Sequence, residues 1–404
     1  ATFATPGQRT VTLTVSNGSF EVDSMSKTDF IKVYAATTYV ATNGANLAPF
    51  TNWNTAASNI QDAVNLAVTG GTVFIGPGTY YISNQVTVTR ALLLQGVAGR
   101  SATILEKAAS VTTRILTLSH AAAVADGMTL KGGISTTQDD VGGNVLMAAG
   151  LLRNSTITAG SAIYGAGIQL NAGVVSNCIL LANATKSGSG ASGQGGGIYM
   201  NAGTATHCTV ISNTSIRQAP GIRIAGVATL RNSTILRNSS GGNAANSGAV
   251  YMDAAGVVEN CLFVGNTNTS ITGSGGVSLN NAGARIRNCT IIGNVATNVG
   301  GLLLLNGSAT NLIVWNNYGI GGTNDIFGTN KIGFSSSPDL THDPLGTGNI
   351  TNNPLFVDPG SGYGVAHILG DYHLAANSPC VDTGFSIPEL LTGVDLDGNP
   401  RLRG

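Results

Sequence analysis

The sequence predicts an all-β solenoid, in which the chain winds into stacked turns that each contain two or three short strands. A phrase led by Asn in six copies and by His in one occurs seven times, at spacings of 23, 30, 25, 28, 28 and 23 residues, a mean of about 26. Side chains alternate as in β-strands, and no segment between residues 72 and 315 carries a helical apolar stripe. One turn cannot bury its own inward side chains, so equivalent residues should stack in columns. The leading residues are Asn154, Asn177, His207, Asn232, Asn260, Asn288 and Asn311.

A second Asn follows the leading residue by six positions from the second copy onward. Asn tolerates the left-handed backbone at a bend, and its amide can donate to and accept from an identical amide one turn away. The predicted structural ladder consists of Asn183, Asn213, Asn238, Asn266, Asn294 and Asn317.

Cysteines also recur, directly after the leading residue. Cys178 should stack on Cys208, and Cys261 on Cys289. Parallel side-chain vectors disfavour a disulfide between stacked cysteines, and five cysteines cannot all pair within one chain. We therefore expect free thiols.

The two ends differ from the repeats. Residues 53–68 predict an amphipathic helix that covers the open end of the core before the first strand, 72–75. Beyond Trp315 the repeat decays into a loop-rich cap. Residues 7–34 predict two strands with one apolar face, formed by Val11, Leu13 and Val15. Two strands alone are marginally stable in water, so this segment should pack on the helix or complete a sheet with a neighbouring molecule.

Composition limits the partners. The 404 residues have a formal net charge of zero and only 9% charged residues, which argues against nucleic acid or an anionic membrane as a partner. No apolar run is long enough for a membrane-spanning helix. A surface rich in Ser, Thr, Asn and Gly suits an extracellular or cell-surface protein. Because the chain begins with Ala1 and no secretory signal precedes it, we expect a processed or truncated chain.

The candidate ligand-binding residues lie in an outward column of the glycine-led strands. Aromatic and arginine side chains in line on a rigid sheet can stack on sugar rings, whereas the alternative is an ordinary solvated face. The candidates are Tyr199, Arg223 and Tyr251, together with the adjacent acidic pair Asp139 and Asp140. The repeats from 154 to 317 contain two acidic residues, Asp253 and Glu259, so we assign no catalytic residue.

A second outward column is apolar, and either the Gly-rich loops or another molecule should cover it. The self-association candidates are Leu181, Ile211, Leu236, Val264, Ile292 and Trp315. The candidate metal ligands are Asp395 and Asp397, which have the acidic alternation of a calcium loop but lack its downstream Glu. Their segment is better interpreted as a structural turn. Ca²⁺ is the one candidate cofactor.

Three segments resemble known families. Residues 59–99 resemble the opening of secreted bacterial proteins of the pectin-lyase-like superfamily, which implies a right-handed parallel β-helix. GNITNNPLFVDP at 348–359, GDYHLAANSPCVDTG at 370–384 and VDLDGNPR at 394–401 are similar to a choice-of-anchor region. Residues 7–34 are similar to the last strands of a polycystic-kidney-disease-type (PKD) repeat. The expected organisation is a PKD-like segment at 1–40, a linker and capping helix at 41–71, the β-helix at 72–320 and the choice-of-anchor-like region at 321–404.

Enzymes of this superfamily cleave acidic polysaccharides with a calcium-binding carboxylate cluster and a base, or with several Asp on neighbouring turns. The repeats from 154 to 317 lack the corresponding Asp-pair and Gly-His-Gly signatures. We therefore expect a non-catalytic secreted or cell-surface protein that acts in adhesion or in self-assembly of a filament or matrix. The alternative is a polysaccharide-binding protein, or a polysaccharide-cleaving lyase or hydrolase.

Overall fold

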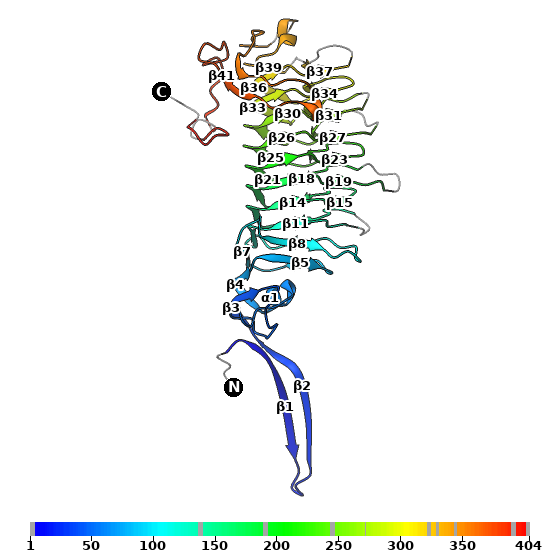
Figure 1. Ribbon diagram of the computed structural model, residues 1–404, viewed down its shortest axis with the longest axis vertical. Coiled ribbons are helices and arrows are strands. Elements are labelled where there is room, and N and C mark those ends of the chain that lie inside the picture. Colours follow the sequence, from blue (N-terminus) through cyan, green and yellow to red (C-terminus); the bar gives the residue numbers. More distant parts are fainter. Residues whose placement is uncertain are drawn as a thin grey trace.

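The computed structural model describes residues 5–135, 140–188, 193–242, 247–270, 272–320, 325–328, 331–342, 346–388 and 393–400. The protein is a long stack of parallel turns with a two-stranded ribbon at its N-terminal end (Figure 1). This confirms the predicted all-β parallel β-helix. Among the described residues, no helix is long and apolar enough to cross a membrane.

Three parallel sheets run along the stack. The large sheet contains β3 (Ala35–Val40), β4 (Ala67–Ile75), β5 (Gly78–Ile82), β7 (Leu93–Gly96), β8 (Thr103–Lys107), β10 (Val124–Asp126), β11 (Thr129–Lys131), β13 (Leu151–Arg153), β14 (Thr156–Thr158), β17 (Val174–Ser176), β18 (Ile179–Leu181), β21 (Gly203–Thr206), β22 (Thr209–Ile211), β25 (Ala228–Arg231), β26 (Thr234–Leu236), β29 (Val257–Glu259), β30 (Leu262–Val264), β33 (Arg285–Ile292), β36 (Ser308–Trp315) and β39 (Ile332–Gly333).

The other two sheets complete each turn. The ten-stranded sheet contains β6 (Val86–Val88), β9 (Leu116–Leu118), β12 (Val145–Met147), β16 (Ile168–Leu170), β20 (Ile198–Met200), β24 (Ile222–Ile224), β28 (Val250–Met252), β32 (Val277–Leu279), β35 (Leu302–Leu304) and β38 (Ile326–Phe327). The short-strand sheet contains β15 (Ser161–Ala162), β19 (Ala184–Thr185), β23 (Thr214–Ser215), β27 (Ser239–Ser240), β31 (Thr267–Asn268), β34 (Val295–Ala296) and β37 (Tyr318–Gly319).

Repeat length varies mainly in the connection between the short-strand sheet and the ten-stranded sheet. The 30-residue spacing contains the connection 186–197, whereas the two 23-residue spacings contain the connections 163–167 and 297–301. The strands and bends of successive turns therefore stay in register while this connection changes.

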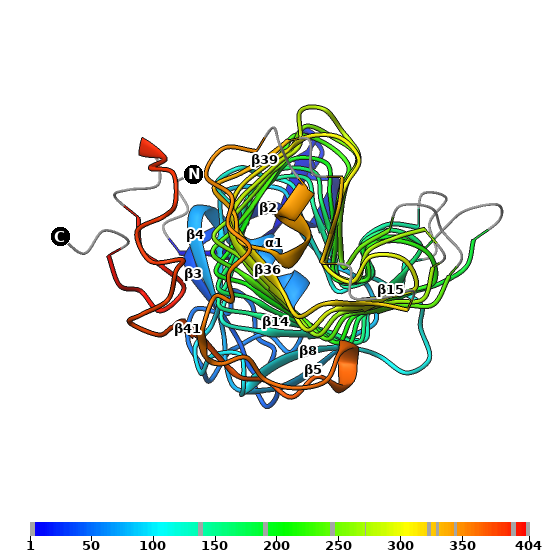
Figure 2. The ribbon, with the colours of Figure 1, turned by 90° about the horizontal axis from the view of Figure 1, so that it is seen from above.

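The predicted capping helix is present but shorter than expected. Helix α1 spans Ile60–Leu66 and buries one face that includes Ile60 and Val64. Asn59 caps its N-terminus, because the Asn59 side chain accepts from the Gln61 N–H. It contacts β3, β4 and β6 and lies within the outline of the turns when the stack is seen from above (Figure 2). The chain leaves the helix at Ala67, which has extended backbone and begins β4. This confirms the prediction that a helix closes the N-terminal end of the core.

The solenoid extends beyond the predicted limits of 72 and 320. Strand β3 already pairs in parallel with β4, so the first turn begins within the segment that the sequence assigned to the PKD-like piece. At the other end, β38 pairs with β35 and β39 pairs with β36. The stack therefore reaches from residue 35 to beyond residue 330.

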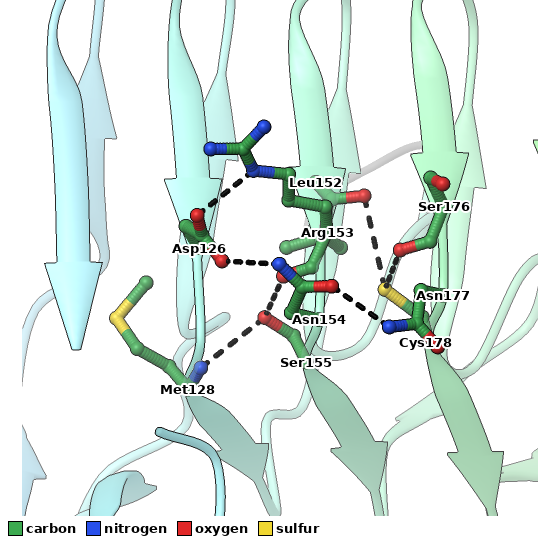
Figure 3. A network of polar contacts seen from close by, with 9 residues as sticks. All are labelled: Asp126, Met128, Leu152, Arg153, Asn154, Ser155, Ser176, Asn177 and Cys178. Carbon is green, nitrogen blue, oxygen red and sulfur yellow. Dashed lines mark hydrogen bonds and ion pairs between the residues drawn. The ribbon is translucent and has the colours of Figure 1, made fainter. Parts of the chain in front are cut away.

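The leading Asn of each repeat forms the corner at which the large sheet bends. Asn154 has a φ of 52° and His207 a φ of 53°, so the His occupies the same left-handed corner as the Asn residues. Figure 3 shows the corner side chains in register across turns: Asn177 donates to Asn154 at 2.8 Å, and Asn154 donates to Asp126 at 2.8 Å. Arg153 completes the network through a 2.8 Å ion pair with Asp126.

The second Asn column forms the predicted ladder, which is fully buried. From Asn183 to Asn294, each side-chain amide donates to the amide oxygen of the next turn, for example Asn183 to Asn213 at 2.8 Å and Asn238 to Asn266 at 3.0 Å. Within the described residues these Asn do not have a positive φ, and the preceding residue takes it instead, as at Ala182 and Ser212. Of the two columns, the left-handed backbone therefore falls on the corner column, whereas side-chain amide bonds between turns occur in both columns.

The cysteines stack in the core as predicted, and all five are free. The backbone N–H of Cys261 donates to the sulfur of Cys289 at 3.4 Å. Burial raises the pKa of the Cys178 thiol, and it raises the pKa of Cys208 to about 11. These four side chains act as small core residues that leave the strands close together.

The C-terminal region folds back along the outside of the stack (Figure 2). It contains η1 (Pro338–His342), β40 (Phe356–Asp358), η2 (Gly364–Ala366) and β41 (Asp371–Leu374). Gly364 donates to the carbonyl of Gly293 at 2.8 Å, and Arg237 donates to the carbonyl of His367 at 2.9 Å. These bonds attach the tail to the bends that follow β26 and β33.

Candidate functional site

The aromatic and arginine column lies on the outward face of the ten-stranded sheet. Register places Tyr199 beside Arg223 and Arg223 beside Tyr251, as predicted. The Arg223 guanidinium lies 5.8 Å from the Tyr199 ring centroid and 5.0 Å from that of Tyr251. The three candidates therefore form one contiguous cation–π stack.

This stack is less accessible than the sequence suggested. Tyr251 is buried and Tyr199 and Arg223 are half-buried, and burial raises the pKa of Tyr199. Arg223 forms an ion pair with Asp253 and donates to Gln218 at 2.6 Å. The outward column is therefore only partly accessible, and the Arg223 side chain is already held by its own neighbours.

Of the acidic pair proposed as a ligand site, the structure describes only Asp140. Asp139 lies outside the described residues. Asp140 is buried, has a φ of 38°, and forms a 2.8 Å ion pair with Lys186. Its backbone carbonyl accepts from the N–H groups of Ile163 and Tyr164, both at 3.1 Å. Asp140 therefore fixes a loop to the next turn.

The apolar self-association column is in register but is covered at one end. Leu181 is 37% exposed, whereas Leu236, Val264 and Ile292 are buried. Ile211 and Trp315 are half-buried. The tail segment 364–367 contacts the bend residues Gly265 and Gly293, which follow Val264 and Ile292. The sequence left open whether loops or another molecule cover this column, and at Leu236, Val264 and Ile292 the tail of the same chain packs on the bends that follow.

A hollow of about 500 Å³ lies between the tail and the Asn corner of the large sheet. His373 lies between two carboxylates there: its Nε2 contacts Asp397 at 2.8 Å, and its Nδ1 contacts Asp371. The hydrogen bonds to Asp371 and Asp397 raise the pKa of His373, and those from His373 lower the pKa of Asp371. When it is protonated, His373 can donate from both ring nitrogens, and its contacts join β41 to the turn at 394–400.

The same geometry engages the candidate metal ligands Asp395 and Asp397 in hydrogen bonds. The Asp395 side chain accepts from the backbone N–H groups of Asp397 at 3.0 Å and Asn399 at 2.8 Å. The Asp397 carboxylate faces His373. Across the described part of the chain, no group of three or more His, Cys, Asp or Glu side chains could hold a metal ion. Asp395 therefore shapes a hydrogen-bonded turn, and calcium binding at Asp395 and Asp397 stays a prediction.

Two ladder members were missed by sequence reasoning. Asn144 donates to Asn183 at 3.1 Å and begins the ladder, and Asp325 accepts from Asn317 at 2.7 Å and ends it. Burial raises the pKa of Asp325 to about 7. Neither Asn144 nor Asp325 belongs to the repeated phrase. Only the position of each residue next to the Asn ladder could have indicated its role.

The N-terminal ribbon exposes apolar side chains. Strands β1 (Gly7–Ser16) and β2 (Val22–Val33) pair antiparallel, and Leu13 lies opposite Met25. Leu13 is 65% exposed and Met25 is 66% exposed. The expectation that this segment packs on the helix of its own molecule is wrong, because the ribbon projects away from the stack (Figure 1).

The sheets, the corner and the ladder define the class of this protein as a parallel β-helix. No known protein-family model matches the chain, and no curated protein matches it in sequence. Among solved structures, a chain described as "Rhamnogalacturonan lyase" is similar over 80% of this chain and 90% of its own length, with 11% identity and a TM-score of 0.33. At that similarity the match carries no argument about activity or substrate.

Proposed function

We propose that the protein is a non-catalytic, extracellular or cell-surface β-helix that self-associates through its N-terminal ribbon, as a building unit of an adhesive or matrix assembly. The observation that carries this proposal is the exposed apolar face of the ribbon. That face consists of Val11, Leu13, Val15 and Met25. An isolated two-stranded ribbon with an exposed apolar face is only marginally stable in water. The tail motifs that resemble a choice-of-anchor region support a surface location.

The ribbon's register makes this face self-complementary. Leu13 pairs with Met25 at the centre, Val11 pairs with Lys27 on one side, and Val15 pairs with Asp23 on the other. Two ribbons can stack face to face about a two-fold axis through the Leu13–Met25 pair. Val11 then covers Val15 of the second copy, and Lys27 faces Asp23 of the second copy. An isologous contact that matches apolar with apolar and positive with negative is the arrangement expected of a dimer.

The experiment is a charge-swap series measured by sedimentation velocity across a wide range of protein concentrations. Asp23→Lys and Lys27→Asp each place like charges opposite one another, so each should weaken association. The double variant Asp23→Lys with Lys27→Asp restores opposite charges and should restore association. Lys32→Glu is the matched control, because Lys32 pairs with Gln8 on the other face.

Two results would overturn the proposal. One is a wild-type chain that stays monomeric at every concentration. The other is a double variant that associates no better than the single variants. The contact rests on four apolar side chains per partner, against about 20–30 residues per partner in a standard interface, so the expected association is weak and depends on concentration.

The state of the acidic side chains supports a non-catalytic role. Between residues 100 and 320, each described acidic side chain forms an ion pair: Glu106 with Lys131, Asp126 with Arg153, Asp140 with Lys186, Asp253 with Arg223 and Glu259 with Arg287. Paired carboxylates of this kind are poor general bases and poor calcium ligands.

Polysaccharide binding or cleavage is the second candidate, favoured by the half-buried Tyr199–Arg223 pair. An arginine between aromatic rings suits the carboxylate and the ring face of an acidic sugar. Incubation with pectin and alginate, followed by ultraviolet absorbance and reducing-end assays, tests cleavage. We expect no unsaturated product and no new reducing ends, and turnover would favour the enzyme.

A further inference from the structure

A second hollow, of about 650 Å³, lies at the N-terminal end of the solenoid, far from the tail. The loop at 41–56 forms one wall, and the residues at the end of β4 form the other. Its lining residues are Ala41, Asn43, Ala45, Trp53, Asn54, Gly76, Pro77 and Val97. None of these carries a formal charge.

Trp53 is the dominant side chain of this hollow, and its indole is held in place on two sides. The Tyr39 ring meets it edge-on, with ring centroids 4.8 Å apart and an interplanar angle of 72°. Tyr39 in turn contacts Phe74 at 5.6 Å. Gly76 lies directly against the indole, since a Cβ at Gly76 would come within 3.2 Å of Trp53 Cζ3. Trp53 nevertheless remains 43% exposed.

The loop that carries Trp53 is fixed to the stack by backbone hydrogen bonds. The backbone N–H of Tyr39 in β3 donates to the carbonyl of Phe50 in the loop at 2.8 Å, and within the loop Ala45 donates to the carbonyl of Asn54 at 3.2 Å. Asn43 and Asn54 are exposed at the rim of the hollow. A side-chain amide supplies both donors and acceptors. The indole and the amides at the rim are therefore already positioned to contact a ligand without rearrangement of the loop.

This chemistry is selective for one class of ligand. A fixed aromatic ring offers a flat apolar face to the C–H side of a pyranose ring, and the amides can bond to hydroxyl groups at its edge. A uronate polymer would also need a cation to pair with its carboxylates, and the lining has none. We propose that this hollow binds a neutral sugar ring of an oligosaccharide or polysaccharide. The proposal does not depend on self-association through the ribbon.

Intrinsic fluorescence gives a direct test, because the chain has two tryptophans. In a Trp315→Phe background Trp53 is the sole reporter. Titration with cello-, xylo-, manno- and malto-oligosaccharides should produce a saturable change with at least one of them, and none with oligogalacturonate. The absence of a change with all four neutral series would overturn the proposal, as would equal binding of oligogalacturonate.

Affinity electrophoresis in gels that contain the responding neutral polymer measures the contribution of the platform. Trp53→Ala should weaken binding roughly 10-fold to 100-fold, as expected for loss of a central aromatic contact. Tyr81→Ala is the matched control, since Tyr81 is 70% exposed and lies outside the hollow. Asn54→Ala keeps the indole and should weaken binding less. Far-UV circular dichroism confirms that each variant is folded, and an undiminished affinity of folded Trp53→Ala would contradict the proposal.

Discussion

The Asn ladder and the N-terminal ribbon lie in opposite surroundings. In the ladder, every side-chain amide is buried and has partners on the neighbouring turns, such as the 3.0 Å bond from Asn213 to Asn238. In the ribbon, Leu13 and Val15 are more than half exposed. Repetition along the axis satisfies the first region from within the molecule, whereas the second has no neighbouring turn to cover it. Regular stacking thus buries the polar groups of the solenoid, whereas the apolar side chains of the ribbon stay exposed.

Breaking the ladder at its middle should have the largest effect on stability. Asn238→Leu removes the oxygen that accepts from both the backbone N–H and the side-chain amide of Asn213. It also removes the donor to the Val210 carbonyl, so three buried groups lose a partner. Each orphaned buried group costs about 1–3 kcal/mol, so the expected loss of unfolding free energy is roughly 3–9 kcal/mol. Urea unfolding followed by far-UV circular dichroism measures it.

The control for that variant is Asn306→Leu, which changes an exposed Asn outside the ladder. Equal midpoints for Asn238→Leu and the wild type would mean that the ladder contributes no stability.

The end of the ladder should make stability depend on pH. Burial raises the pKa of Asp325 to about 7, from 3.8 in the unfolded chain. Between these values the folded state holds a proton that the unfolded state has released, so the free energy of unfolding falls as the pH rises from about 4 to about 7, by at most about 4 kcal/mol.

Asp325→Asn keeps the acceptor for Asn317 and removes the charge, so it should abolish that part of the pH dependence. Urea midpoints between pH 4 and pH 8 measure it, with Asp358→Asn as the exposed control. A wild type and an Asp325→Asn variant with parallel pH profiles would contradict the burial of this carboxyl group.

The smallest expected effect concerns the reactivity of the cysteine thiols in the core of the solenoid. Cys178, Cys208, Cys261 and Cys289 are buried, and burial raises the pKa of the first three thiols. In the folded protein an Ellman assay should detect one fast thiol, Cys380, which is only partly buried. Urea should expose all five, and Cys380→Ser should remove the fast phase. Rapid reaction of a second thiol under native conditions would show that the turns open.

The stacked features were predictable because they repeat. Asn266 and Cys261 occur at fixed offsets within the phrase, so likeness in sequence became proximity in space. Asn144 and Asp325 escaped prediction because they reach the ladder from outside the phrase. The burial of Val264 depends on a tail that does not repeat, and the setting of Trp53 depends on a loop that the sequence suggested was helical. Contacts between unlike segments leave no periodic signal in one sequence.

The connection between the short-strand sheet and the ten-stranded sheet has a practical consequence. It has room for 12 residues at 186–197 and only five at 163–167, yet the corner and ladder residues on either side keep their register. Extra sequence grafted there should leave the scaffold intact. The molecule is thus suited to display foreign peptides at regular heights along one flank, with the length of each graft chosen independently of the next.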